Sequence, residues 1–397
     1  MRYRDLLLIP NVRRLAAARF LTNVCFYSTV IVAFETSRGL NYTGMFGMES
    51  VLSLAMFAFE VPTGVWADRW GHRRLVVAGY ALEFAGTLLM AFAWGFWMFA
   101  LSTFLFGVGL ACLSGCESAM LYEGLPDHER ETAGASAFAL LSSSGSAGFF
   151  CGLAVGSFMG ARNPDLAVYA TLVPFALGFL AATRLRAGDG RADHDSPAQT
   201  AGGLLGQAAE LVRREPGTAA LSLMNSAAFG MVNAMLWFNQ DLMNREGIPV
   251  FWFGPITAAA MALQMGVGLF APRADRAFGR KTALALALLA PGVAYLASAY
   301  IAGPVAVCLL IGMVIAGGAW RSPLMEAEIN SRISDGARAT TLSALSFLGT
   351  LAGIGLNLLI GAARDLSLTT VLQVNGAIMV ALALLPPLLI RRTAASS

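Results

Sequence analysis

The chain has 397 residues, of which 57% are hydrophobic and 13% are charged, and its mean hydropathy is +0.64. Soluble domains carry roughly a quarter charged residues, so this composition excludes an ordinary soluble protein and indicates a membrane protein. The net charge of +3 says little by itself, because in membrane proteins the placement of the basic residues carries the information.

Twelve apolar stretches are long enough to cross a membrane as helices, because about 20 residues at 1.5 Å per residue span a hydrocarbon core of ~30 Å. They cover residues 15–35, 44–66, 75–93, 96–119, 134–159, 165–183, 218–240, 250–270, 282–300, 303–320, 340–360 and 368–390. The first stretch is too long for the apolar core of a signal peptide, so we expect it to remain as the first helix. The sequence therefore predicts an all-α membrane protein with twelve transmembrane helices.

The basic residues predict the orientation. If the N-terminus is cytoplasmic, all Lys and Arg residues lie in cytoplasmic loops or helix ends except Arg38, Arg162, Arg245 and Arg364. The opposite orientation would reverse this bias and violate the positive-inside rule. We therefore expect both termini to lie in the cytoplasm.

A polar segment from Arg184 to Gly217 divides the chain into halves of six predicted helices. Its first part reads as a flexible linker. Its second part has apolar residues on one helical face, which predicts either a short helix on the inner membrane surface or a packed linker helix. We expect six-helix bundles over residues 1–184 and 218–397, joined by a cytoplasmic linker over residues 185–217.

One charged turn occurs twice. Its first copy runs from Gly64 to Arg74, and its second copy lies 207 positions later, from Arg273 to Lys281. The same offset places Gly148 on Gly355, so the register holds outside the turn. Because each half has six helices and starts on the same side, we expect two pseudo-symmetric bundles related by a parallel repeat. From the two copies we single out as candidate functional residues Asp68, Arg69, Gly71, Arg73, Arg74, Asp275, Arg276 and Arg280.

The pattern Gly-x-x-x-Asp-Arg-x-Gly-x-Arg-Arg and the twelve predicted helices resemble the major facilitator superfamily (MFS). The first copy is similar to its signature loop between helices 2 and 3, and the second to the loop between helices 8 and 9. In that family the acid and arginines form a charge cluster that stabilises the outward-open state. The resemblance implies this gating role for Asp68, with Arg69, Arg73 and Arg74 as partners. The alternative is that the arginines only set the topology.

Two further segments, Glu60–Gly64 and Ser114–Glu123, are similar to a branch of bacterial exporters in this superfamily. Other positions depart from its drug–proton antiporters: Thr103–Gly107 lacks their helix 4 arginine, and Gly148–Leu153 lacks their helix 5 proline.

Three acidic residues lie within predicted membrane helices, Glu60, Glu83 and Glu117. An ionisable group at membrane depth is costly, so each is a functional candidate. One interpretation is that they bind and release protons as the cavity alternates between the two faces. The other is that they are structural acids paired with an arginine or a backbone donor. For Glu83 we prefer the structural interpretation, because its helix is usually peripheral in the superfamily.

Polar and aromatic residues at helical spacing mark candidate substrate contacts. Helix 7 has Asn225, Phe229, Asn233 and Trp237 on one face, which should not point to lipid. The other candidates are Thr350 and Asn357 in helix 11, Asn23 and Tyr27 on one face of helix 1, and Gln264 in helix 8. Each residue taken alone also suits an interhelical hydrogen bond. A cavity with aromatic walls, amides and few charges favours an apolar or amphipathic organic molecule.

We therefore expect a secondary transporter of a bacterial inner membrane that works by alternating access and exports a small apolar or amphipathic compound in exchange for protons. The alternatives are an importer of a small polar nutrient and a non-transporting sensor with a permease fold. No phosphate-binding loop and no metal-ligand spacing occur, so we expect no enzyme activity, cofactor or metal site. The expected partners are the substrate, protons and the lipid bilayer, without nucleic acid, and the expected functional unit is a monomer.

Overall fold

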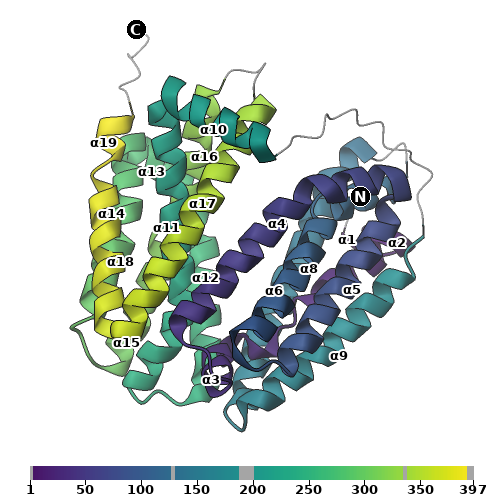
Figure 1. Cartoon of the computed structure of the whole chain (residues 1–397), viewed down its shortest axis with the longest axis horizontal. Coiled ribbons are helices and arrows are strands. Elements are labelled where there is room, and N and C mark those ends of the chain that lie inside the picture. The colour runs from purple at the N-terminus through teal and green to yellow at the C-terminus, as the bar shows by residue number, and fades with distance from the viewer. Residues whose placement is uncertain (1–2, 127–129, 187–200, 334–337, 391–397) are drawn as a thin grey trace. The chain divides into compact units, whose positions relative to one another are not determined.

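The structure is a computed structural model that describes residues 3–126, 130–186, 201–333 and 338–390 (Figure 1). Within these ranges every regular element is a helix, which confirms the predicted all-α fold. Eleven helices are long and apolar enough to cross a membrane, and a bent pair near the N-terminus makes a twelfth if it counts as one span.

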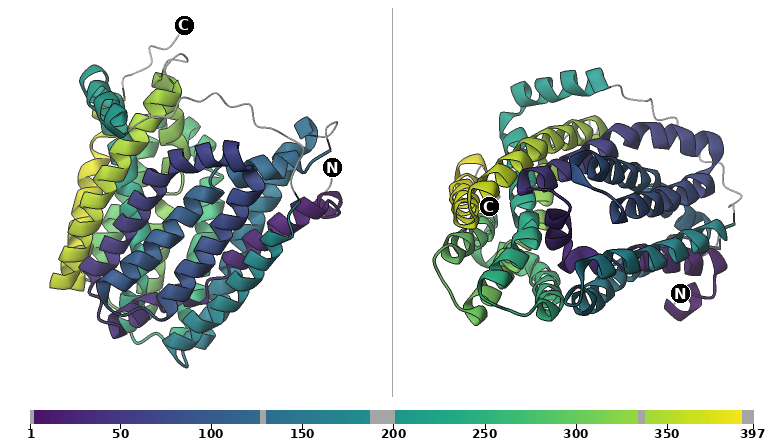
Figure 2. Two further views of the ribbon diagram at one scale, coloured as in Figure 1. Left: turned by 45° about the vertical axis from the view of Figure 1, so that its right-hand side comes forward. Right: turned by 60° about the horizontal axis from the view of Figure 1, so that its bottom comes forward.

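The chain divides into two compact units. Unit 1 comprises Met1–Leu40 and Met48–Ala198, and unit 2 comprises Asn41–Gly47 and Gln199–Ser397. Two further views show the long helices of each unit running side by side (Figure 2). The predicted boundaries at residues 184 and 218 stay a prediction, because residues 187–200 of the expected linker lie outside the described residues.

Unit 1 is built from nine α-helices and one 3-10 helix among the described residues. They are α1 (Tyr3–Leu6), α2 (Pro10–Thr22), η1 (Phe26–Thr29), α3 (Ile31–Ser37), α4 (Tyr42–Trp70), α5 (His72–Ala91), α6 (Gly95–Leu113), α7 (Cys116–Glu123), α8 (Arg130–Gly160) and α9 (Pro164–Thr183). One buried apolar cluster joins α2, α5, α7 and α8 and includes Leu15, Tyr80, Leu121 and Ala137. This core holds the membrane-length helices in register around the polar groups described below.

Unit 2 is likewise built from long helices and several shorter ones. Its elements are α10 (Ala201–Arg214), α11 (Pro216–Arg245), η3 (Val250–Trp252), α12 (Phe253–Gly268), α13 (Ala271–Phe278), α14 (Arg280–Ser298), α15 (Pro304–Gly317), α16 (Arg321–Arg332), α17 (Arg338–Leu366), α18 (Leu368–Ala383) and α19 (Pro386–Leu389). The helix expected in the second part of the linker is α10, which packs against α11 and α17.

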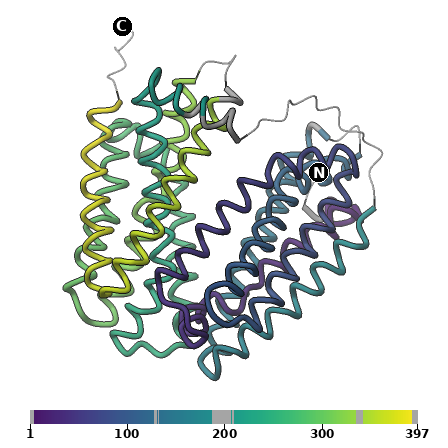
Figure 3. Tube along the Cα trace, viewed as in Figure 1, coloured from purple at the N-terminus to yellow at the C-terminus, as the bar shows by residue number. Residues whose placement is uncertain are grey.

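The first turn of α4 belongs to unit 2, although α4 is one helix whose trace is continuous (Figure 3). The carboxylate of Asp365 accepts hydrogen bonds from the backbone N–H groups of Tyr42 and Thr43, at 2.8 and 2.9 Å. These N–H groups have no partner within the helix, so Asp365 caps α4 from α17. A second acid, Asp241 of α11, accepts from the Tyr42 hydroxyl and from Arg364 Nε at 2.9 Å.

The prediction of one continuous first helix over residues 15–35 is wrong. The helix α2 ends at Thr22, and the chain passes through η1 before α3 begins at Ile31, with a bend of 64°. Tertiary contacts stabilise the break, because the backbone N–H of Phe26 donates to Thr171 Oγ1 of α9 at 3.1 Å instead of to a helical carbonyl. The short-range pattern of apolar residues carries no signal for such a contact.

Glycines of α8 allow this broken segment to pack closely. Gly148, Gly152, Gly156 and Gly160 follow one another at intervals of four residues and so line one face of α8. A Cβ atom on Gly152 would lie 2.7 Å from the backbone nitrogen of Cys25 and 3.0 Å from its carbonyl oxygen. Small residues at this spacing let two helix backbones approach in a membrane.

Two other predicted helices are broken in the structure. The fourth consists of α6 and α7, separated at Gly115, whose φ of +76° is unfavourable for other residues. The tenth consists of α15 and α16 and extends to Arg332, twelve residues beyond the predicted end at 320. The two charged turns each contain a positive-φ glycine, Gly71 at +85° and Gly279 at +74°, which start α5 and α14.

Candidate functional site

A buried polar cluster in unit 1 brings together three helices. Arg19 of α2 forms an ion pair with Glu117 of α7, with 3.3 Å between Nη1 and Oε2. The other oxygen of Glu117 accepts a hydrogen bond from the hydroxyl of Tyr80, a fully buried residue of α5. After the break at Gly115 the chain restarts as α7 one residue before Glu117, so the acid stands in the first turn of a helix, where the helix dipole favours a negative charge.

Glu83 lies one turn after Tyr80 on the same face of α5. Its side chain is 3% exposed, and its Oε2 atom is buried without a hydrogen-bond partner. It is close enough to Glu117 and Arg19 to interact with both electrostatically. The structure thus brings together two of the three acids singled out in the sequence, and Arg19 interacts with both of them.

The third acid, Glu60, is not part of this cluster. It lies on α4, is exposed within unit 1, and its carboxylate has no hydrogen bond or ion pair to the described residues. A second acid pair, absent from our predictions, lies elsewhere in the unit. Glu35 of α3 is buried, with Oε2 unpartnered, and interacts electrostatically with Glu49 of α4. Both acids fall within predicted apolar stretches, so the criterion used for Glu83 would have found them.

The first copy of the charged turn does not form an internal ion pair. Asp68, Arg69 and Arg74 are exposed, and the described residues include no hydrogen-bond or ion-pair partner for the Asp68 carboxylate. Arg73 donates instead to the carbonyl oxygens of Leu185 and Thr183 at the end of α9, at 2.6 and 3.2 Å. The turn is therefore fixed to α9 by arginine–carbonyl bonds, which leaves Asp68 available.

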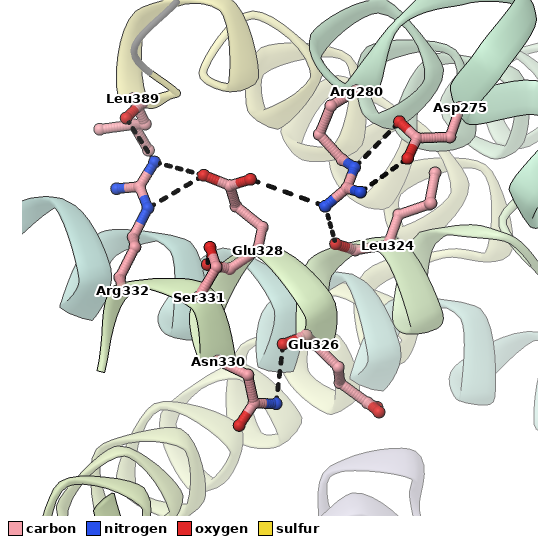
Figure 4. Close-up of polar contacts among 9 residues, drawn as sticks. All are labelled: Asp275, Arg280, Leu324, Glu326, Glu328, Asn330, Ser331, Arg332 and Leu389. Carbon is pink, nitrogen blue, oxygen red and sulfur yellow. Dashed lines mark hydrogen bonds and ion pairs between the residues drawn. The ribbon is translucent and has the colours of Figure 1, made fainter. Parts of the chain in front are cut away.

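The second copy forms a closed network within unit 2 (Figure 4). Arg280 donates from Nε and Nη2 to both oxygens of Asp275, at 2.9 and 2.6 Å. Its Nη1 atom lies 3.7 Å from Glu328 of α16, which also binds Arg332 at 2.7 Å. The neighbouring Arg276 donates only to the carbonyl of Pro272 in its own helix, at 3.2 Å. This network joins α13, α14 and α16, so the two copies share a sequence but not a set of contacts.

The predicted polar stripe of helix 7 lies on the less buried face of α11. Phe229 is 62% exposed, and Asn225, Asn233 and Trp237 are half-buried, whereas Ala228, Met231, Ala234 and Met235 on the other side of the helix are fully buried. Trp237 packs against Phe46, with 5.9 Å between the ring centroids. The adjacent α17 carries the predicted Thr350 and Asn357, and α12 carries Gln264; all three are half-buried.

The expectation that Asn23 and Tyr27 share a helical face is wrong, because the helix ends between them. Asn23 is the residue after α2, and its side chain donates to the carbonyl oxygen of Arg19 at 2.8 Å. Tyr27 lies in η1. Asn23 therefore stands beside the arginine of the buried cluster, while Tyr27 belongs to the segment that packs on α8.

Two arginines that contact other helices, Arg19 and Arg321, were not among the predicted site residues. The sequence places Arg19 at a helix end and Arg321 just after the tenth apolar stretch, so both count toward the basic cytoplasmic loops. In the structure Arg321 is 4% exposed and donates from Nη1 to the carbonyl and side-chain oxygens of Asn225. A basic residue next to a span gives no signal of burial, because the end of a span is predicted from sequence only to within a few residues.

Comparisons with known proteins agree with this architecture. The family model for the Major Facilitator Superfamily matches residues 15–357. Among solved structures, the nucleoside transporter NupG matches with a TM-score of 0.77 and 15% identity, over 95% of this chain and 98% of that one. A mutant form of NupG gives 0.82 at 15% identity, over 97% and 100%.

A POT family transporter in complex with 5-aminolevulinic acid matches with a TM-score of 0.69 and 12% identity, over 96% of each chain. No match was found among curated protein sequences. These identities establish the fold and leave the substrate open, whereas the family model spans most of the sequence. The chain therefore belongs to the major facilitator superfamily and is a membrane transporter of that type.

Proposed function

We propose that this protein is a proton-coupled secondary transporter that exports a small apolar or amphipathic compound across a bacterial inner membrane, with both termini cytoplasmic. The observation that carries the coupling is the buried cluster of Arg19, Tyr80, Glu83 and Glu117. The outward direction rests on the resemblance of Glu60–Gly64 and Ser114–Glu123 to bacterial exporters.

The cluster contains the parts that proton exchange requires. Glu117 has two partners of different strength, a cationic guanidinium and a neutral hydroxyl, so its charge depends on whether Arg19 stays in place. A charge on Glu83 would be costly, because one of its oxygens is buried without a partner. In our proposal, a proton taken up by Glu117 weakens the Arg19–Glu117 pair, while Glu83 is the neighbouring acid with which Arg19 also interacts. The loosened pair couples protonation to the position of α2 relative to α7.

The charged turns supply the conformational bias in this proposal. Asp68 lies at the end of α4 without a partner among the described residues, so it is available to form a contact in one transport state only. A contact present in one state shifts the equilibrium by its differential free energy. Asp275 is already paired with Arg280, and we assign it to holding α13 against α14.

The substrate contacts are assigned to the less buried face of α11. Phe229 and Trp237 offer apolar surface, and Asn225 and Asn233 offer hydrogen bonds, a combination that suits a small amphipathic molecule. Uptake of a polar nutrient and binding without transport are the alternatives that the experiment separates.

The test uses purified protein in proteoliposomes that contain a pH-sensitive dye. The compounds are rhodamine 6G, 4-phenylbutyrate, uridine and dialanine, each added with and without an imposed pH gradient. We expect an amphipathic compound to move protons, and the sign of the internal pH change distinguishes exchange from co-transport. Glu83→Gln and Glu117→Gln are the test variants, and Glu210→Gln on the exposed face of α10 is the control.

We expect Glu117→Gln to abolish proton movement and Glu83→Gln to reduce it, with Glu210→Gln unchanged. Flux that ignores the pH gradient, or wild-type coupling in both test variants, contradicts the proposed role of the cluster. Proton movement with uridine or dialanine alone would establish the nutrient alternative. Binding without flux of any compound would identify a sensor.

A further inference from the structure

Unit 2 contains a buried arginine that forms no ion pair with any of the described residues. Arg321 is the first residue of α16, directly after the break that separates this helix from α15. Its side chain turns toward α11, where Nη1 donates to the carbonyl oxygen of Asn225 at 2.7 Å and to the side-chain oxygen of the same residue. Both acceptors are neutral, so these hydrogen bonds bring no negative charge to the guanidinium.

No acid within the described part of unit 2 forms an ion pair with Arg321, and the exposed Glu326 interacts with its charge only beyond ion-pair distance. Each of the described acids is engaged elsewhere or exposed: Asp241 binds Arg364, Glu246 binds Arg245, Asp275 and Glu328 bind Arg280, Glu210 binds Arg214, Glu215 accepts from Thr218, Asp365 caps α4, and Glu326 is exposed. Arg19 of unit 1 differs in this respect, because it forms an ion pair with Glu117. A buried charge is normally paired, because its desolvation costs several kcal/mol.

One donor of Arg321 is unused. Its Nε atom is buried and has no hydrogen-bond partner among the described residues. An N–H of a guanidinium that is left without an acceptor is costly, and its natural acceptor is a carboxylate, whose two oxygens match the fork of donors. The buried, unpartnered Nε therefore points to a ligand group that supplies negative charge.

The surroundings of Asn225 define the rest of such a ligand. The side-chain oxygen of Asn225 is occupied by Arg321, which leaves its Nδ2 group as a further donor. Phe229 stands one turn along the same face of α11 and is 62% exposed within the described chain, and Asn233 follows after another turn. The guanidinium of Arg321, which comes from α16, and the amides of α11 thus lie beside the exposed aromatic ring of Phe229 on α11.

We propose that Arg321 and Asn225 bind the carboxylate of an amphipathic organic acid whose apolar body lies against Phe229. This proposal rests on the transport function proposed above and narrows its substrate class from apolar or amphipathic compounds to monoanions. A single charge is specified because one guanidinium with an unpartnered Nε lies at this place, and the second charge of a dianion would be buried without a partner.

The experiment measures binding, so that it stays separate from transport. Isothermal titration calorimetry of the full-length protein in detergent at pH 7 compares 4-phenylbutyrate with its neutral amide, 4-phenylbutyramide. A hydrogen bond to a charged group corresponds to about a tenfold difference in affinity or more. We expect the acid to bind the wild type at least tenfold more tightly than the amide.

Arg321→Gln should remove this preference, Arg321→Lys should retain part of it, and Asn225→Ala should reduce it. Arg245→Gln is the control, because it removes a positive charge from α11 at its far end, where Arg245 binds Glu246. If Arg321→Gln does not fold, Arg321→Lys, Asn225→Ala and the comparison of acid and amide on the wild type still test the anion site.

Equal affinity of the wild type for acid and amide, including no binding of either, overturns the proposal. So does an Arg321→Gln protein that keeps the preference. Acid binding without proton-coupled flux would support the anion site and contradict the transport proposal. Proton-coupled flux of a neutral compound, without any preference for the acid, would support the transport proposal and contradict the anion site.

Discussion

Replacing Gly156 by alanine tests the close packing between α8 and the broken first helix. A Cβ atom at this position would lie 2.7 Å from the backbone carbonyl carbon of Phe26 and 2.8 Å from its Cα, and the carbonyl oxygen is closer still. Ordinary contacts begin at 3.4 Å. The two backbones would therefore have to separate by at least about 0.7 Å, and none of the atoms concerned can rotate away.

The expected cost follows from this geometry. Overpacking of a tight interior costs typically ~1–3 kcal/mol, and we take the upper end because the neighbours are backbone atoms. The higher helix propensity of alanine offsets about 1 kcal/mol of this loss of stability. The net loss of about 2 kcal/mol should lower the melting temperature by roughly 4–8 °C for a unit of this size. Size-exclusion chromatography of heated, detergent-solubilised samples measures the shift.

Gly355 provides a matched control. It is also a mid-helix glycine, and it occupies the position that the 207-residue repeat pairs with Gly148. In α17, however, a Cβ atom added to Gly355 would have no atom of another helix within 4 Å. Gly355→Ala should leave the melting temperature unchanged or raise it slightly. Equal stability of Gly156→Ala and the wild type would refute the close approach of α8 to Phe26.

Three further predictions concern the charged turn and one loop. Gly71→Ala should destabilise unit 1 by about 1–3 kcal/mol, seen as a lower melting temperature, because φ of +85° with ψ of 146° is nearly restricted to glycine. Asp68→Asn should cut flux while membrane insertion, measured by fractionation, stays intact; normal flux would count against gating by Asp68. The Gly303 N–H and Arg245 hold the pKa of Glu246 below its usual value, so its stabilisation is present above about pH 4.3 and is lost as the pH falls through the lowered pKa. Glu246→Gln should therefore melt at a lower temperature than the wild type at pH 7, with the difference shrinking toward pH 3; a constant difference would speak against this ion pair.

The positions of the buried acids could be read from the sequence, but their partners could not. An acid inside an apolar stretch stands out, and Glu83 and Glu117 were found in this way. Tyr80 and Arg19 complete the cluster, yet each lies on a different helix from Glu117. Which side chains meet depends on how each helix is rotated about its axis. Several of these helices have no distinct polar and apolar faces, so their sequences say little about that rotation.

The internal repeat was a better guide to the backbone fold of the two halves than to their side-chain contacts. Arg73 and Arg280 are equivalent by the 207-residue offset, but one binds backbone carbonyls and the other binds Asp275. Gly148 and Gly355 likewise differ in what lies beside them. A repeat preserves the path of the backbone, whereas side-chain partners change with single substitutions on neighbouring helices.

The sequence by itself determined the membrane class, the helical fold, the approximate spans and the two glycine turns. These follow from local physics, because a bilayer requires about 20 apolar residues per crossing and a positive φ requires glycine. Only the tertiary structure decided that the first helix breaks after Thr22, that Arg19 neutralises Glu117, and that Arg321 is buried beside Asn225. Each of these depends on a donor, acceptor or closely packed backbone that another helix brings, and such contacts leave no mark on the local pattern of residues.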